Sequence, residues 1–139
     1  MNKKVKVFIV NLFAVMLFAV NGIMCLAASG EVQIGILPNQ VWTSQSDHTD
    51  ARTGKYSSVY ARNHAVRPIS GIDTFSKIQV RVTNGYGLVV SDIYTLNESA
   101  SNNTSIPIKD GYLDIELVGF QFRGNSDSPA YATVSYDGR

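Results

Sequence analysis

Hydrophobic and polar residues alternate along several short segments of this chain, a pattern typical of β-strands. The clearest alternation lies in residues 75–83, where Ile78, Val80 and Val82 are separated by polar residues. Successive side chains of a strand point to opposite faces of a sheet, so this segment predicts a strand with one buried face and one solvated face.

Six further segments are rich in β-branched or aromatic residues and are bounded by Gly, Pro, Asn or Asp, as strands usually are. They cover residues 32–37, 56–66, 88–96, 104–109, 112–122 and 131–136. No helical period follows residue 28. We therefore expect an all-β fold, an antiparallel β-sandwich or small barrel of about six to seven strands, and we favour the sandwich.

Turns and irregularities can also be located. Asn84 to Gly87 and Asp110-Gly111 stand between strand patterns and predict two hairpins, because glycine tolerates the positive φ of tight turns. The apolar residues of 112–122 change parity midway, which predicts a β-bulge near Gly119. Pro107 cannot donate a ladder hydrogen bond, so its strand should lie at a sheet edge. The strand at 131–136 is a second candidate for an exposed edge.

The first 28 residues have the layout of a secretory signal peptide. Three lysines, Lys3, Lys4 and Lys6, precede an apolar run over residues 7–26, and small residues follow at 27–29. We expect cleavage after residue 27, 28 or 29. Residues 29–139 would then form a single β-sandwich domain with a polar loop at about 38–55.

Cys25 is the only cysteine of the chain and lies upstream of each expected cut. Met24 precedes it, which disfavours lipidation because a lipoprotein signal places small residues there. The alternative to cleavage is a retained anchor, since about 20 apolar residues span a bilayer. Cleavage leaves a cysteine-free chain, which excludes thiol catalysis, cysteine-based zinc sites and stabilising disulfides.

The leader resembles those of Gram-positive bacterial exports, with a lysine-rich start and a long apolar core. This resemblance covers the leader alone. It implies a bacterial protein that is secreted and extracellular, or associated with the cell envelope, and that meets the membrane only through its leader before cleavage. Glycosylation acceptor patterns between Asn97 and Ser105 would then be coincidental.

Charge argues against nucleic acid as a partner. The chain has 12 Lys and Arg against 11 Asp and Glu. Removing the three leader lysines leaves a net charge of about −2, whereas a sequence-independent nucleic-acid binder needs a basic surplus.

Candidate chemistry is sparse, and we expect no enzyme, no metal and no cofactor. Asp47, His48 and Asp50 match no calcium or zinc spacing, so we interpret them as a solvated loop. A nucleophile elbow of the G-x-S-x-G type is absent. Asp114 and Glu116 alternate along one predicted strand, where such acids are usually solubilising rather than catalytic.

Aromatic and basic residues give the best indication of function. Trp42 stands in a polar loop, either as an exposed ligand anchor or as a plug over one end of the sandwich. Arg62 and His64, with Val66 as a further candidate, should share one strand face. We expect non-catalytic binding of an extracellular protein or glycan by one outward face that carries Trp42, Arg62, His64, Lys77 and Arg81. The alternatives are a secreted antibacterial or antagonistic protein and, third, a small hydrolase that uses His48 or His64.

Overall fold

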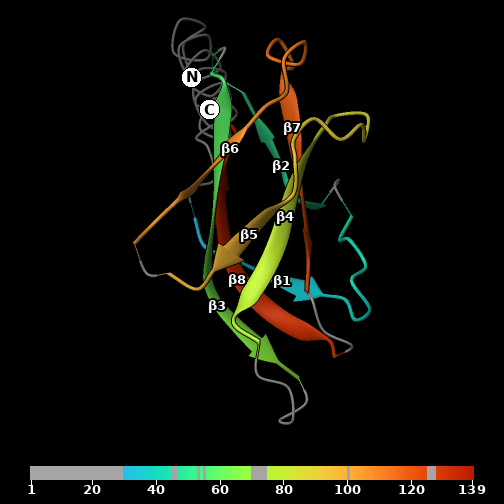
Figure 1. Cartoon of the computed structure of the whole chain (residues 1–139), viewed down its shortest axis with the longest axis vertical. Helices are drawn as coiled ribbons and strands as arrows, with labels where there is room; N and C mark the ends of the chain where they lie inside the picture. The colour runs from blue at the N-terminus through green and yellow to red at the C-terminus, as the bar shows by residue number, and fades with distance from the viewer. Residues whose placement is uncertain are drawn as a thin grey trace, which may run out of the picture.

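Eight strands in two facing sheets make up the described part of this protein (Figure 1). The structure is a computed structural model that describes residues 30–44, 47–52, 54, 56–69, 75–99, 101–124 and 128–139. Every pairing between two of the named strands is antiparallel, so the expected all-β sandwich is confirmed. Nothing in the described ranges forms a helix of the length and apolarity that crossing a bilayer requires. The expected leader, residues 1–28, lies outside the described residues.

Each sheet contains four strands. Sheet A has, in spatial order, β1 (Val32–Ile36), β8 (Ala130–Asp137), β3 (Ser58–Pro68) and β6 (Thr104–Pro107). Sheet B has β2 (Thr49–Ala51), β7 (Leu117–Arg123), β4 (Lys77–Asn84) and β5 (Tyr94–Asn97). Each sheet keeps two edge strands, so the fold is a sandwich rather than a closed barrel.

The core lies between the sheets and is filled from both. Alternate residues of every long strand point inward, as the pleat requires. The largest fully buried side chains are Phe120 and Phe122 of β7, Ile36 of β1, Ile78 of β4 and Leu96 of β5. Sheet A adds Val59, Ile106 and Val134 from its other strands.

Three predictions from the pattern are confirmed in detail. Ile78, Val80 and Val82 of β4 are buried, while Lys77, Gln79 and Arg81 between them face outward. Strand β6, which ends at Pro107, lies at the edge of sheet A. The turn after β4 is also present, because the amide of Gly87 donates to the carbonyl oxygen of Asn84 at 3.0 Å.

The region around residues 110–122 differs from the prediction. Residues 112–116 are not a strand, and β7 begins only at Leu117. Asp110-Gly111 makes no hairpin, because β6 and β7 belong to different sheets and the chain crosses between them here. The β4–β7 register runs without a break through Gly119, so the prediction of a β-bulge there is wrong. The parity change marks the start of β7 rather than an extra residue.

Three other assignments need correction. The polar loop at 38–55 contains the short strand β2, which pairs with β7 through its backbone. The segment 88–96 is a strand only at β5, although Val89 makes an isolated bridge to Thr83. The C-terminal strand β8 is not an edge, because it lies between β1 and β3.

The bulge of this fold lies on β3, at His64. Asn63 pairs with Val134 and Ala65 pairs with Thr133, so His64 is the additional residue in the β3–β8 ladder. The bulge reverses which residues face inward after it. Val66 is therefore buried in the core and does not share the outward face of Arg62 and His64.

Candidate functional site

The five residues expected on one outward face lie on two different sheets. Arg62 and His64 point outward from β3 of sheet A, whereas Lys77 and Arg81 point outward from β4 of sheet B. The outer faces of the two layers of a sandwich look in opposite directions. The prediction of a single binding face is therefore wrong. The residues belong instead to two separate clusters, one on each sheet.

Trp42 lies over the outer face of sheet B. The guanidinium carbon of Arg81 and that of Arg123 each lie 4.4 Å from the centroid of its indole ring. Arg81 is on β4 and Arg123 is the last residue of β7. This arrangement places two cations against one aromatic ring, so Trp42 is not a plug of the sandwich end.

Hydrogen bonds to β7 hold the loop that carries Trp42. The amide of Thr43 donates to the carbonyl oxygen of Phe122, and the amide of Phe122 donates to Thr43 Oγ1, both at 2.9 Å. Gln121 Nε2 also donates to the carbonyl oxygen of Thr43 at 3.1 Å. The residue after Trp42 is thus fixed against the strand whose arginine contacts the indole.

The backbone before Trp42 adopts an uncommon conformation. Asn39 and Gln40 both have positive φ, at 60° and 59°. Consecutive non-glycine residues in the left-handed region are costly, and such strain tends to gather where a loop must present a particular side chain. Here the two residues turn the chain so that Trp42 reaches sheet B.

Two glutamines orient the arginines. Arg81 Nε donates to Gln121 Oε1 at 2.8 Å, and Arg123 Nε donates to Gln79 Oε1 at 2.7 Å. Each pair is formed by residues directly opposite in the β4–β7 ladder. We call the set of Trp42, Gln79, Arg81, Gln121 and Arg123 the Trp42 platform.

The electrostatics of the Trp42 platform favour an incoming anion. Partial burial, and then the neighbouring charge of Arg123, lower the pKa of Arg81. Within the part of the chain that the structure describes, no aspartate or glutamate pairs with either arginine. Both hydrogen bonds to glutamine use Nε–H, so neither of them occupies an Nη group.

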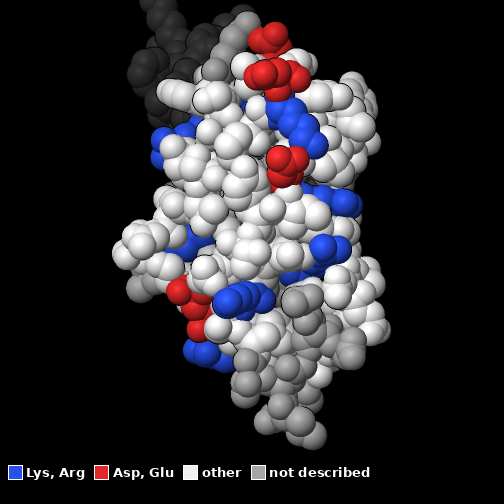
Figure 2. Space-filling model, in the orientation of Figure 1, with Lys and Arg blue, Asp and Glu red and all other residues white. Residues whose placement is uncertain are grey.

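Lys77 extends this basic character along β4. It lies on the same outward face as Arg81, four residues earlier, which corresponds to about 13 Å along a strand. The space-filling view shows basic side chains along the middle of the visible face, with acidic ones mainly toward its upper end (Figure 2).

Arg123 and the two glutamines were not among the residues predicted to bind. A signal for them exists in the sequence, because the tripeptides Gln79-Val80-Arg81 and Gln121-Phe122-Arg123 share the same order. Antiparallel pairing of two Gln-x-Arg segments places each arginine opposite a glutamine. The pattern becomes visible only once the two strands are known to be neighbours.

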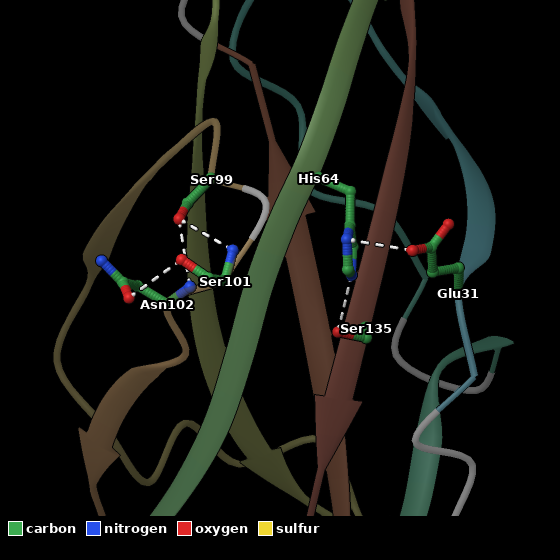
Figure 3. Close-up of polar contacts among 6 residues, drawn as sticks. All are labelled: Glu31, His64, Ser99, Ser101, Asn102 and Ser135. Atoms are coloured by element: carbon green, nitrogen blue, oxygen red, sulfur yellow. Dashed lines mark hydrogen bonds and ion pairs between the residues drawn. The ribbon is translucent and has the colours of Figure 1, made fainter.

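Arg62 and His64 belong to a second cluster, on the outer face of sheet A. His64 Nε2 lies 2.9 Å from Ser135 Oγ, and its Nδ1 lies 3.2 Å from Glu31 Oε1. Figure 3 shows His64 between these two side chains, which come from β8 and from the segment before β1. A cavity of about 70 Å³ beside Ser135 is lined by Tyr60, Arg62, Asn103 and Asp137 among others.

The other polar group in Figure 3 is a local turn. Ser99 Oγ accepts from the amides of Ser101 and Asn102, at 3.4 and 3.1 Å. Ser101 Oγ donates to Asn102 Oδ1 at 3.3 Å. These bonds satisfy polar groups of the loop between β5 and β6, and the three residues form no binding site.

His48 lies in neither cluster, and its interpretation as part of a solvated loop is wrong. The side chain is 9% exposed and packs edge-on against Phe122 and Tyr136, with ring centroids 5.8 and 6.2 Å away. Burial is the main influence on it and lowers its pKa, while the charge of Asp47 acts in the opposite direction. Neighbouring Asp50 accepts a hydrogen bond from the amide of Gly138 at 2.7 Å.

Among the described residues, no three His, Cys, Asp or Glu side chains gather in a way that could hold a metal ion. Comparison with known protein families, with curated proteins and with solved structures finds no match for this chain.

Proposed function

We propose that this is a secreted protein that binds an acidic polysaccharide, without cleaving it, through the Trp42 platform. The observation that carries the proposal is the placement of two guanidinium groups over one indole ring, at 4.4 Å each. Export is the expectation drawn from the leader.

Paired arginines suit an anionic group on the ligand. Guanidinium forms two parallel hydrogen bonds with a carboxylate or phosphate, and the planar fork is already oriented here by glutamine. An arriving anion also relieves the mutual repulsion between Arg81 and Arg123 that accompanies the lowered pKa of Arg81. A neutral ligand would leave that repulsion in place.

A polysaccharide suits the remainder of the platform. A tryptophan side chain offers a large rigid surface, against which a sugar ring can pack. Lys77 lies about 13 Å along the same strand face, so a polymer with repeated negative charges can contact both ends. A single small anion would use only the arginine pair.

The test is binding of the purified protein to polygalacturonic acid, with its fully methyl-esterified form as the uncharged ligand control. Arg81→Gln and Arg123→Gln should each weaken binding about tenfold or more, because a charge-assisted hydrogen bond contributes about 1.5–3 kcal/mol. Trp42→Ala should weaken it as well. Isothermal titration calorimetry measures each affinity.

Arg67→Gln is the matched protein control, because Arg67 is an exposed arginine on the other sheet. It should leave the affinity for polygalacturonic acid unchanged. Equal binding of the charged and esterified polymers would refute the proposal, as would full affinity in Arg81→Gln while circular dichroism shows an intact fold.

A further inference from the structure

We infer that Ser135, His64 and Glu31 form a nucleophilic site that cleaves short-chain carboxylic esters, acetyl esters in particular. This activity is independent of the Trp42 platform, which lies on the opposite sheet. From the sequence, a hydrolase that uses His64 is only the third alternative, and neither Ser135 nor Glu31 is a candidate, because the three residues come together only through the strand order of sheet A.

The hydrogen bonds of His64 determine its role. Glu31 is an acceptor when ionised, so the 3.2 Å contact requires that His64 Nδ1 carries the proton. In the neutral imidazole Nε2 is then an acceptor, and Ser135 donates its hydroxyl proton to it across 2.9 Å. This is the order of groups in which a carboxylate orients a base and the base activates a nucleophile.

The bulge on β3 contributes to this geometry. His64 is the additional residue of the β3–β8 ladder, and bulges often redirect a side chain next to an active site. His64 is thereby directed to Ser135 even though Arg62, not His64, is the ladder partner of Ser135. The side chain of His64 is 13% exposed, so its ring is held in a protected position.

The cavity beside Ser135 determines the size and charge of the substrate. Its volume of about 70 Å³ accommodates a few waters or an acetyl group but not a long acyl chain. Arg62 lines it and lies directly across the ladder from Ser135, at the distance of a cross-strand pair. A positive charge therefore borders the cavity in which an oxyanion would form during attack on a carbonyl.

The reaction has two balanced steps. Ser135 Oγ bonds to the carbonyl carbon, its proton moves to His64 Nε2, and the alcohol leaves with that proton as the C–O bond breaks. Water then attacks the acyl-serine through the same base, which releases the carboxylic acid and returns the proton to Oγ. Glu31 acts as a positioning residue for the ring of His64.

The test uses p-nitrophenyl acetate and the purified protein. We expect release of p-nitrophenolate and, by peptide mass spectrometry, one acetyl group on Ser135. Ser135→Ala and His64→Gln should each lower the rate by about a hundredfold or more. Ser105→Ala removes an exposed serine from the edge strand of the same sheet and should have no effect.

Glu31→Gln tests whether Glu31 positions the ring of His64 or only supports the fold. Loss of positioning should lower kcat and leave KM unchanged. Absence of acetyl-Ser135 in the wild-type protein would overturn the inference, and so would equal acetylation in His64→Gln. None of these outcomes affects the polysaccharide test, which depends on the other sheet.

Discussion

His48 illustrates how a polar residue in a polar loop becomes part of the core. Its ring packs edge-on against the rings of Phe122 and Tyr136. Phe120 stacks on Tyr136 with the ring centroids 4.8 Å apart. His48 Nδ1 is buried and has no hydrogen-bond partner among the described residues. A protonated imidazole would be costly at this position.

This environment predicts a pH dependence of stability. Burial lowers the pKa of folded His48 below 6.5, so the unfolded chain binds a proton at higher pH than the folded protein does. The free energy of unfolding should be fully retained above pH 6.5 and should fall as the pH drops below 6.5 toward the folded pKa.

Urea unfolding at a series of pH values on both sides of 6.5 measures this effect. His48→Gln cannot titrate and should lose that part of the slope. If the variant and the wild-type protein lose stability in parallel on acidification, His48 is not responsible.

At the level of elements, a buried asparagine joins the two sheets. Asn63 of β3 is fully buried, and its Nδ2 donates to the carbonyl oxygens of Ser76 and Leu96, each at 3.3 Å. Ser76 precedes β4 and Leu96 lies in β5, so these bonds run from sheet A to sheet B. The amide of Ser99 donates to the carbonyl oxygen of Asn63 at 2.9 Å, so this backbone group of β3 also has a hydrogen-bond partner.

Asn63→Ala should therefore lower the free energy of unfolding by about 1–3 kcal/mol, because the carbonyl oxygens of Ser76 and Leu96 each lose a hydrogen bond from Asn63. Asn97→Ala, at an exposed position of β5, should change it by less than about 0.5 kcal/mol. Chemical denaturation monitored by circular dichroism gives both values. Equal effects of the two substitutions would contradict the cross-sheet role of Asn63.

The strands could be predicted from the sequence where the local pattern of apolar and polar residues is regular. The strict alternation of Ile78, Val80 and Val82 located β4, and Pro107 identified an edge strand, because both signals are local. The short strand β2 has no apolar alternation, since it forms by backbone pairing with β7. The bulge at His64 was not predicted because the inward position just before it holds a polar residue, Asn63, which hides the change of parity.

The candidate sites were harder to predict than the strands. Trp42 and Arg81 were among the residues predicted to bind, but their contact with Arg123 depends on which strands are neighbours. His64 was identified without Ser135 or Glu31, which lie 71 and 33 residues away in the sequence. Residue type and spacing carry no information about contacts of that range, which arise from strand order alone.

At the scale of the whole molecule, packing of the two sheets is the main source of stability. The chain has a single cysteine, so no intramolecular disulfide can form. The buried side chains come from both sheets and constitute one core. Separation of the sheets would expose this entire core, so neither sheet should be stable alone.

Unfolding should therefore occur in a single cooperative transition. Trp42, the only tryptophan, reports on sheet B by fluorescence, while far-ultraviolet circular dichroism reports on both sheets. The two urea transitions should have the same midpoint. Separate midpoints would indicate that the sheets unfold independently.

The position of the last strand governs when this molecule can fold. β8 lies between β1, the first strand, and β3, so sheet A cannot assemble until the C-terminal residues have been synthesised. Pairings across so much sequence are slow to form. The nascent chain should thus lack a complete sheet A, and leave its core side chains uncovered, until β8 has been synthesised.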